Sequence, residues 1–278
     1  MFNHKILINP QLIINELSFL YNIPIISGET LVFIDEIQTT PEAIVSLRYF
    51  YEQIPDLHII AASLLLDHTL NEMQYSMPVG RVEFAYMYPL NFNEFLTANK
   101  ETGLVNYIKN FIFEQTFSKV IHEKIMEYLR LYFFIGGMPE AVNTYIEIKN
   151  RIEVEKVHSS IITSLQYDFA KYGTRKQQEY LKECLNYVAG NSGKKIKYVN
   201  INRNVSSANL KEVLVKLEIS KVIHFVTKTQ SLKVPINQYV NSNTFKTIFI
   251  DIGLANHLSK IKFIDIHNLI TNHEGSLA

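Results

Sequence analysis

The sequence has a single cysteine, no long apolar run and no net charge, and each of these features excludes a class of protein. Cys184 alone can form neither an internal disulfide nor a cysteine-based zinc site, and at an apolar helical position we expect a buried core thiol. No stretch reaches the roughly 18 apolar residues that span a bilayer. Residues 1–10 lack the charged and apolar regions of a signal peptide. We therefore expect a cytoplasmic protein with no membrane partner.

The balanced charge conceals two unlike halves. Residues 1–150 hold 9 Lys and Arg against 17 Asp and Glu, a net charge of −8, and residues 151–278 hold 18 against 10, a net charge of +8. Cations are densest in residues 171–233, with 13 basic and 4 acidic side chains. Such a density favours a phosphate-rich partner such as DNA, but it is also common on ordinary solvated faces.

The first part of the chain has the pattern of an α/β fold. With 278 residues and 47% hydrophobic side chains, the chain can form about two domains. In residues 1–98, apolar runs alternate with a helical period, which predicts a parallel sheet with crossover helices. The expected strands are residues 31–34, 57–62 and 82–86.

A crossover helix is expected between the first two strands. Thr40 can cap it, and Pro41 and Glu42 suit its first turn. Its expected buried stripe is Ile44, Leu47, Tyr51 and Ile54.

The rest of the chain is expected to form two further parts. Residues 99–173 have a helical pattern, which we interpret as a lid or connector. Residues 174–278 predict a helix, a Gly-rich turn, a second helix capped by Ser206 or Ser207, and then a strand, which is the order of a winged-helix unit. The apolar positions of its two helices are Leu181, Cys184, Leu185, Val188, Leu210, Val213, Leu214 and Leu217.

Two acids, Asp35 and Glu36, end the first apolar strand, as in the Walker B strand of P-loop ATPases. The first carboxylate would lie at the carboxyl edge of the sheet and could hold a magnesium ion, usually through water. The second could orient or deprotonate the attacking water. The alternative is a pair of solvated acids at the end of an ordinary strand.

Several short motifs are spaced along nearly the whole chain. They are Asp35-Glu36-Ile37-Gln38, Pro41-Glu42-Ala43, Ser46-Leu47-Arg48-Tyr49-Phe50, Pro78-Val79-Gly80-Arg81, Tyr88-Pro89-Leu90, Phe92, Glu94, Phe95, Gly136-Gly137-Met138-Pro139-Glu140-Ala141, Asp168-Phe169-Ala170-Lys171-Tyr172, Leu210-Lys211-Glu212 and Asp251-Ile252-Gly253-Leu254. In this order they are very similar to a family of prokaryotic AAA ATPases that carry a C-terminal domain of unknown function. The resemblance implies ATP and magnesium as ligands, with Asp35 and Glu36 as catalytic acids and Asp35 as the metal residue.

The sequence departs from this family at both ends. Family members begin with a Gly-rich loop that ends in Gly-Lys-Ser/Thr and holds the phosphates, and the 278 residues contain no such motif. Family members also continue into a restriction-endonuclease-like module. The resemblance therefore implies a truncated AAA ATPase with an incomplete sheet, which does not hydrolyse ATP alone. A separately encoded N-terminal piece or a homo-oligomer would be its partner.

Two further residues take expected roles from the resemblance. The family ends its second strand with a glycine and a polar γ-phosphate sensor. Here Ser63 stands at the glycine position and Leu64 at the polar one, so Ser63 is the sensor only after a shift of one residue. Arg81 belongs to the family's Gly-Arg pair and could reach the nucleotide of its own or a neighbouring subunit. Its alternative role is an ion pair with Glu83 or Asp67.

Two other functions stay open: a winged-helix module that binds nucleic acid or docks a protein, and a gene remnant without function. In the first, the polar side of the helix would enter a major groove. Its candidate residues are Ser206, Ser207, Asn209, Lys211 and Lys216.

Other polar motifs are expected to be structural. Gly136 and Gly137 would serve a turn between helices, and Asp251 would stabilise the fold. His122-Glu123 lacks the second histidine of a zinc protease helix, which excludes that chemistry.

Overall fold

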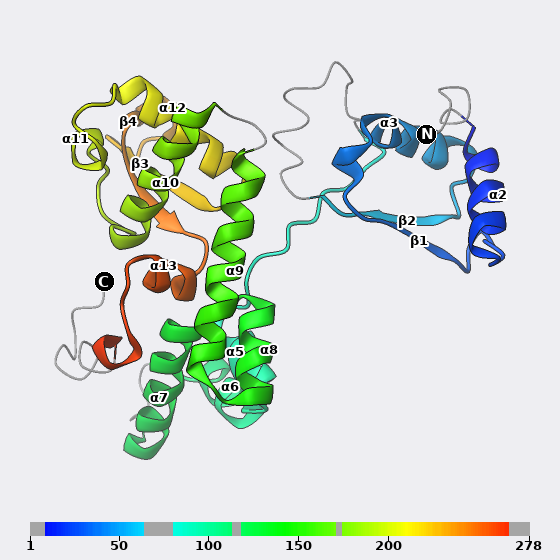
Figure 1. Cartoon of the computed structure of the whole chain (residues 1–278). Coiled ribbons are helices and arrows are strands. Elements are labelled where there is room, and N and C mark those ends of the chain that lie inside the picture. The colour runs from blue at the N-terminus through cyan, green and yellow to red at the C-terminus, as the bar shows by residue number, and fades with distance from the viewer. Residues whose placement is uncertain (1–8, 64–79, 113–117, 171–173, 267–278) are drawn as a thin grey trace. The chain divides into compact units, whose positions relative to one another are not determined.

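The computed structural model describes residues 9–63, 80–112, 118–170 and 174–266 (Figure 1). The chain divides into two compact units, residues 1–86 and residues 87–278, and each is described by itself. Among the helices in the described ranges, none is long and apolar enough to cross a membrane.

Unit 1 is an α/β structure with a small parallel sheet. Strands β1 (Leu31–Ile34) and β2 (His58–Ala61) pair in parallel, and the crossover between them contains α3 (Pro41–Gln53). Helix α2 (Pro10–Tyr21) precedes β1. Both strands and the crossover helix confirm the prediction, while Thr40 stands at the N-cap of this helix without a capping hydrogen bond from its side chain. The core of the unit is formed by Ile13, Ile14, Phe50 and Leu57, with Val32 and Ile59 packed against it from the sheet.

Two predictions for unit 1 are wrong. Residues 82–86 form no strand, since no described strand lies alongside to accept their backbone hydrogen bonds. Tyr51 is 57% exposed, and α3 turns Phe50 into the core instead.

The second face of the sheet in unit 1 is uncovered among the described residues. Leu31, Phe33 and Ile60 share it and are 53%, 59% and 51% exposed. Parallel sheets normally have both faces covered, so this face is open where other parallel sheets carry a helix.

Unit 2 begins with helices, as expected. The capping box of α5 unites Asn91 and Glu94, which explains why a glutamate follows the Tyr88-Pro89-Leu90 motif at this spacing. The helices of this part are α5 (Phe92–Ala98), α6 (Thr102–Lys109), α7 (Lys119–Ile135), α8 (Pro139–Ile148) and α9 (Arg151–Ala170).

The second part of unit 2 contains helices followed by an antiparallel pair of strands. An isolated bridge from Lys195 to Lys246 adds a short third segment beside the pair. All eight apolar positions predicted for the two long helices are buried. The elements are α10 (Arg175–Gly190), α11 (Tyr198–Ile201), α12 (Ser207–Ile219), β3 (Ile223–Thr229) and β4 (Val240–Phe249).

Helix α13 (Ile252–Leu258) joins the two parts of unit 2. It packs against α7 and α9 on one side and α10 on the other, and Figure 1 shows it between them. The first part of unit 2, through α7 and α9, and the second part, through α10, therefore both pack against this one short helix.

Candidate functional site

The site predicted from the sequence lies at the carboxyl edge of the sheet in unit 1. Asp35 and Glu36 directly follow β1, and Ser63 lies two residues beyond the end of β2. Beyond the strands, the N–H of Ala62 donates to Ile34 O at 2.8 Å, and that of Ile37 donates to Ala62 O at 3.1 Å. Because the strands are parallel, this pairing brings the polar ends of both strands to one edge.

A chain of side-chain hydrogen bonds links these strand ends. Gln38 Nε2 donates to Glu36 Oε2 at 2.6 Å, and Ser63 Oγ donates to Gln38 Oε1 at 2.6 Å. Gln38 thus joins the second acid to the hydroxyl at the end of the neighbouring strand. Sequence reasoning included Gln38 in a motif but gave it no role. Its side chain could have been recognised as a link, because an amide has both a donor and an acceptor and Gln38 follows Glu36 by two positions.

The backbone at Asp35 and Glu36 has an uncommon conformation. Glu36 adopts a left-handed conformation with φ of 53°, uncommon for a residue with a side chain, and it is the N-cap of the short helix Ile37–Thr39. Asp35 Oδ1 accepts from the N–H of Glu36 at 3.0 Å, and Thr39 Oγ1 donates to Glu36 O at 2.8 Å. These contacts hold both carboxylates at the exposed end of the strand.

The donors at this edge suit magnesium held mainly through water. Asp35, Glu36, Gln38 and Ser63 offer oxygen atoms, the ligands that Mg²⁺ prefers, and Mg²⁺ usually keeps several waters. The described residues contain no group of three or more His, Cys, Asp or Glu side chains that could enclose a metal. The residues therefore fit a hydrated ion at Asp35, but the sequence offers no Gly-Lys-Ser/Thr loop for the phosphates of ATP.

Arg81 forms an ion pair in unit 1 with an acid that sequence analysis did not consider. Its Nε lies 3.1 Å from Glu52 Oε1, and Arg48 Nε lies 2.9 Å from the same oxygen. The hydrogen bond from Arg48, together with the charge of both arginines, lowers the pKa of Glu52. The expected partner Asp67, like Leu64 at the family's sensor position, lies outside the described residues.

The candidate nucleic-acid residues cluster at the start of α12. Ser206 Oγ accepts from the N–H of Asn209 at 3.3 Å and caps the helix, while Ser207, Asn209 and Lys211 are exposed. Lys216 differs from the others. Its ammonium lies 3.1 Å from Glu212 Oε1, and its side chain is only 25% exposed.

Three of the sequence motifs meet inside unit 2. Asp251 is buried, and its two carboxylate oxygens accept from the N–H groups of Gly137 at 2.6 Å and Leu254 at 2.8 Å. Leu90 in turn donates its N–H to Gly137 O at 2.7 Å. Burial raises the pKa of Asp251, and the backbone donors around it act against that rise. These hydrogen bonds tie the segments around Leu90, Gly137 and Asp251 together, which is a structural role. Gly136 lies in a turn with φ of 74°, as expected.

Cys184 is fully buried in α10. Burial raises the pKa of its thiol to about 12, so the reactive thiolate is not formed at neutral pH.

Two family models match different segments of the chain. Residues 4–96 match the family described as "AAA domain", and residues 126–265 match the "Domain of unknown function (DUF8612)". No curated protein matches the chain. A solved structure, "The walker-type ATPase PABY2304 of Pyrococcus abyssi", is 16% identical with a TM-score of 0.49. The match covers 88% of this chain and 65% of that ATPase. An AAA-type ATPase-like segment thus precedes a match that spans half of the sequence, and the chain belongs to the DUF8612 family.

Proposed function

We propose that the carboxyl edge of the β1–β2 sheet is the magnesium and water-activating half of an AAA-type ATP site. Asp35 holds Mg²⁺ through water, and Glu36 orients the attacking water. The observation that carries this proposal is the hydrogen-bonded chain from Glu36 through Gln38 to Ser63. Ligands of open α/β sheets bind at this edge, and the match of residues 4–96 to an AAA domain supports the same assignment.

In this proposal Gln38 is a positioning residue. Its amide holds one oxygen of Glu36, which leaves the other oxygen free to meet a water molecule. It also couples Glu36 to Ser63, the γ-phosphate sensor. Arg81 would have to leave Glu52 to reach a nucleotide, either in its own subunit or in a neighbouring one.

The other half of the site must bind the phosphates. Backbone amides and the lysine of a Gly-Lys-Ser/Thr loop do this in P-loop ATPases, and the 278 residues contain no such loop. We propose that a phosphate-binding loop outside these 278 residues completes the site, and that residues 1–278 by themselves bind ATP weakly and do not hydrolyse it.

Turnover of ATP with Mg²⁺ tests this proposal. The chain alone should show background turnover that is the same in the Glu36→Gln variant. With the strand, loop and helix of a related AAA domain added in trans, turnover should appear and should fall by about a hundredfold or more in Glu36→Gln. Glu42→Gln, on α3, is the matched control and should keep full turnover. Turnover by the chain alone that Glu36→Gln abolishes would refute the proposed division of the site.

A second function, nucleic-acid binding by residues 174–266, is favoured by the order of elements there. Two long helices with a short one between them precede the β3–β4 hairpin, and the 195–246 bridge adds a third short strand segment. This order supports a winged-helix unit, whose second long helix would be α12. The exposed Ser207, Asn209 and Lys211 at its start would face the DNA.

Salt-dependent binding of duplex DNA to the full chain tests this second function. Affinity should fall steeply between roughly 50 and 200 mM salt, because phosphate contacts release counterions. Lys211→Ala should weaken binding to all sequences equally, and Lys216→Ala should have a smaller effect because Glu212 already pairs with Lys216. Absence of binding at low salt would instead favour a protein-docking role.

A further inference from the structure

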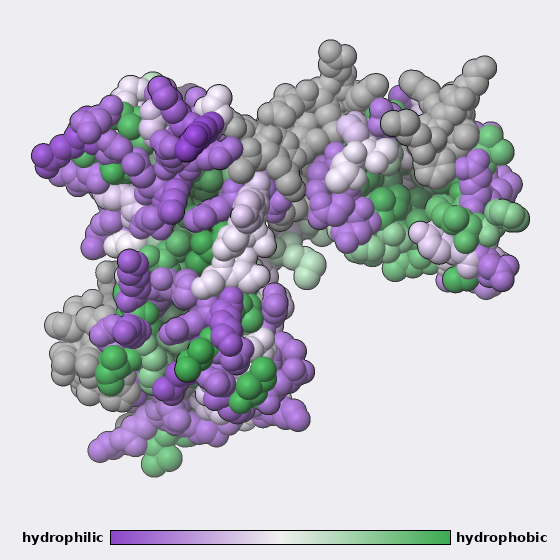
Figure 2. Space-filling view, viewed as in Figure 1, coloured by the Kyte–Doolittle hydropathy of each residue, from purple (hydrophilic) through white to green (hydrophobic). Residues whose placement is uncertain are grey.

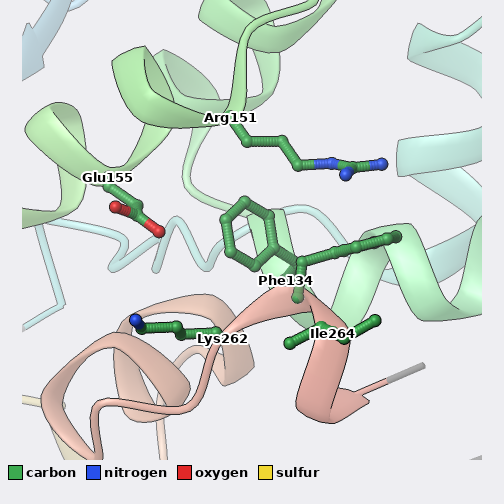
Figure 3. Close-up of a pocket in the computed structure, with 6 residues that line it drawn as sticks. Phe134, Arg151, Glu155, Lys262 and Ile264 are labelled. Atoms are coloured by element: carbon green, nitrogen blue, oxygen red, sulfur yellow. The ribbon is translucent and has the colours of Figure 1, made fainter. Parts of the chain in front are cut away.

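A hollow of about 440 Å³ lies in unit 2, and its lining includes no residue of the two sites described above. It is bounded by the end of α7, the start of α9 and the segment that follows α13 (Figure 3). Its volume is within the range of small-molecule sites. Its walls are Phe134, Arg151, Glu155, Lys262, Phe263 and Ile264.

The charged side chains of this hollow leave their hydrogen-bonding groups unused, although Arg151 lies over the Phe263 ring and the charge of Glu155 acts to raise the pKa of His257. Among the described residues, the side chains of Arg151, Glu155 and Lys262 make no hydrogen bond and no ion pair. Other acids and bases nearby do pair: Glu153, on the same helix, accepts from Lys156 at 2.8 Å. Charged groups that line a hollow without protein partners are available to a ligand, and here two are cations and one is an anion.

Arg151 is already held in a binding geometry. Its guanidinium carbon lies 3.6 Å from the centre of the Phe263 ring, so the group rests over an aromatic face. This contact leaves the N–H donors at the edge of the guanidinium pointing outward, in the fork that matches a phosphate or carboxylate. Less conformational entropy is then lost on binding.

A third cation, Arg130, lies on the face of α7 that carries Phe134. Arg130 is one turn before Phe134, and i, i+4 residues of a helix share a face. Its Nε is buried with no hydrogen-bond partner among the described residues. Arg130 does not itself line the hollow, whose walls hold two cations and one anion, and this net positive charge favours a phosphate as ligand.

The two ends of the hollow differ. Figure 3 shows Glu155 and Lys262 at one end and the guanidinium of Arg151 at the other. The rings of Phe134 and Phe263, which also line the hollow, have planes at 90° and centroids 5.6 Å apart. Phe134 is only 5% exposed, so an aromatic ring of a ligand would pack on the exposed part of the half-buried Phe263.

We propose that this hollow binds a phosphate ester of a planar heteroaromatic compound. The phosphate accepts from Arg151, the ring packs on the exposed part of Phe263, and adjacent donor and acceptor groups of the ring meet Glu155 and Lys262. This site is independent of the proposed ATPase edge, because every residue that forms it belongs to unit 2.

Calorimetric titration of the full chain with AMP tests the site. AMP carries a phosphate, a planar ring and an amine beside a ring acceptor. It should bind at least about tenfold more tightly than adenosine or inorganic phosphate. Inosine monophosphate, which has a carbonyl where AMP has the amine, should bind more weakly because that carbonyl faces the Glu155 carboxylate.

Variants locate the binding. Arg151→Gln should weaken AMP by about tenfold or more and leave adenosine unchanged. Lys156→Gln, a neighbour on α9 outside the hollow, and Asp35→Asn, at the ATPase edge, should both bind AMP as the unaltered chain does. The proposal is overturned by an absence of AMP binding, or by AMP binding that Arg151→Gln leaves intact or Asp35→Asn removes. Thermal unfolding of Arg151→Gln, followed by circular dichroism, checks that the variant is folded.

Discussion

A carboxylate oxygen of Asp251 accepts a 2.6 Å hydrogen bond from the backbone N–H of Gly137, 114 residues earlier in the chain. The same carboxylate caps α13 through the N–H of Leu254. Two backbone carbonyls at the end of α7 also have side-chain partners. Asn256 Nδ2 donates to Phe133 O at 2.7 Å, and His158 Nε2 lies 2.9 Å from Ile135 O. Unit 2 is therefore held together by polar contacts of a helix end, in addition to its apolar core.

Replacing Asp251 with Asn should destabilise unit 2. An amide has one acceptor oxygen, so one of the two N–H groups would face an NH₂ group. We expect the free energy of unfolding to fall by about 2 kcal/mol, the range for a hydrogen bond to a charged group. Asp265→Asn is the control: its exposed carboxylate accepts from the N–H of Lys262 at 2.8 Å and should contribute less than about 1 kcal/mol. Urea denaturation measures both, and equal losses would contradict the role given to Asp251.

Gly253 is placed where a side chain cannot fit. A Cβ at this position would lie 2.5 Å from Ile135 O and 2.6 Å from the N of Gly136, both backbone atoms that cannot move aside cheaply. Gly253→Ala should cost about 1–3 kcal/mol through overpacking between α13 and α7. In α6, Gly103 has nothing within 4 Å of such a Cβ, so Gly103→Ala should stabilise by up to about 1 kcal/mol. If thermal unfolding shows the two substitutions shifting stability in the same direction, the packing described for α13 is wrong.

The buried His158 predicts a loss of stability in mild acid. Burial lowers its pKa to about 4, against the hydrogen bond to Ile135 O, and the nearby His257 lowers it further. The folded state thus favours the neutral ring. Stability is full above the unfolded pKa of 6.5 and falls as the pH drops towards 4. Between about pH 7.5 and pH 5 the loss from this residue should be about 2 kcal/mol.

His158→Gln separates this effect from other titrations, because glutamine keeps an amide donor for Ile135 O but cannot be protonated. Denaturation at both pH values should show a flatter pH dependence for His158→Gln, and an unchanged one for the exposed His122→Gln. An unaltered slope in His158→Gln would show that the ring is not the group that titrates.

The sheet of unit 1 should be less protected from hydrogen exchange than unit 2. Within residues 9–63 and 80–86 it has two strands, and Leu31, Phe33 and Ile60 leave one face open, whereas α10 and α12 bury continuous apolar stripes. Fewer buried contacts around β1 and β2 allow local opening at lower free energy. Strong, uniform protection of residues 31–34 and 58–61 in the monomeric chain would contradict this expectation.

The elements with a regular apolar period could be predicted from the sequence. In α12, Leu210, Val213, Leu214 and Leu217 are all buried, because a period of 3.6 residues identifies a helix face without knowledge of its partner. β1 was also predicted correctly, from a four-residue apolar run followed by acids.

The parts that depend on distant neighbours could not be predicted in this way. Residues 82–86 have the composition of a strand, but a strand also needs a neighbour for its hydrogen bonds. The roles of Gln38 and Asp251 depend on residues 25 and 114 positions away, and no periodicity reports such pairs.

The central claim is that Asp35 holds a hydrated divalent cation at the sheet edge, and paramagnetic NMR with Mn²⁺ and ATP tests it most directly. Mn²⁺ can stand in for Mg²⁺ at oxygen ligands, and its relaxation effect reports weak binding residue by residue. We predict selective broadening of the amides of Glu36, Gln38 and Ser63 that disappears in Asp35→Asn and persists in the exposed control Asp56→Asn. Broadening centred on other residues, or broadening at this edge that survives Asp35→Asn, would contradict the account.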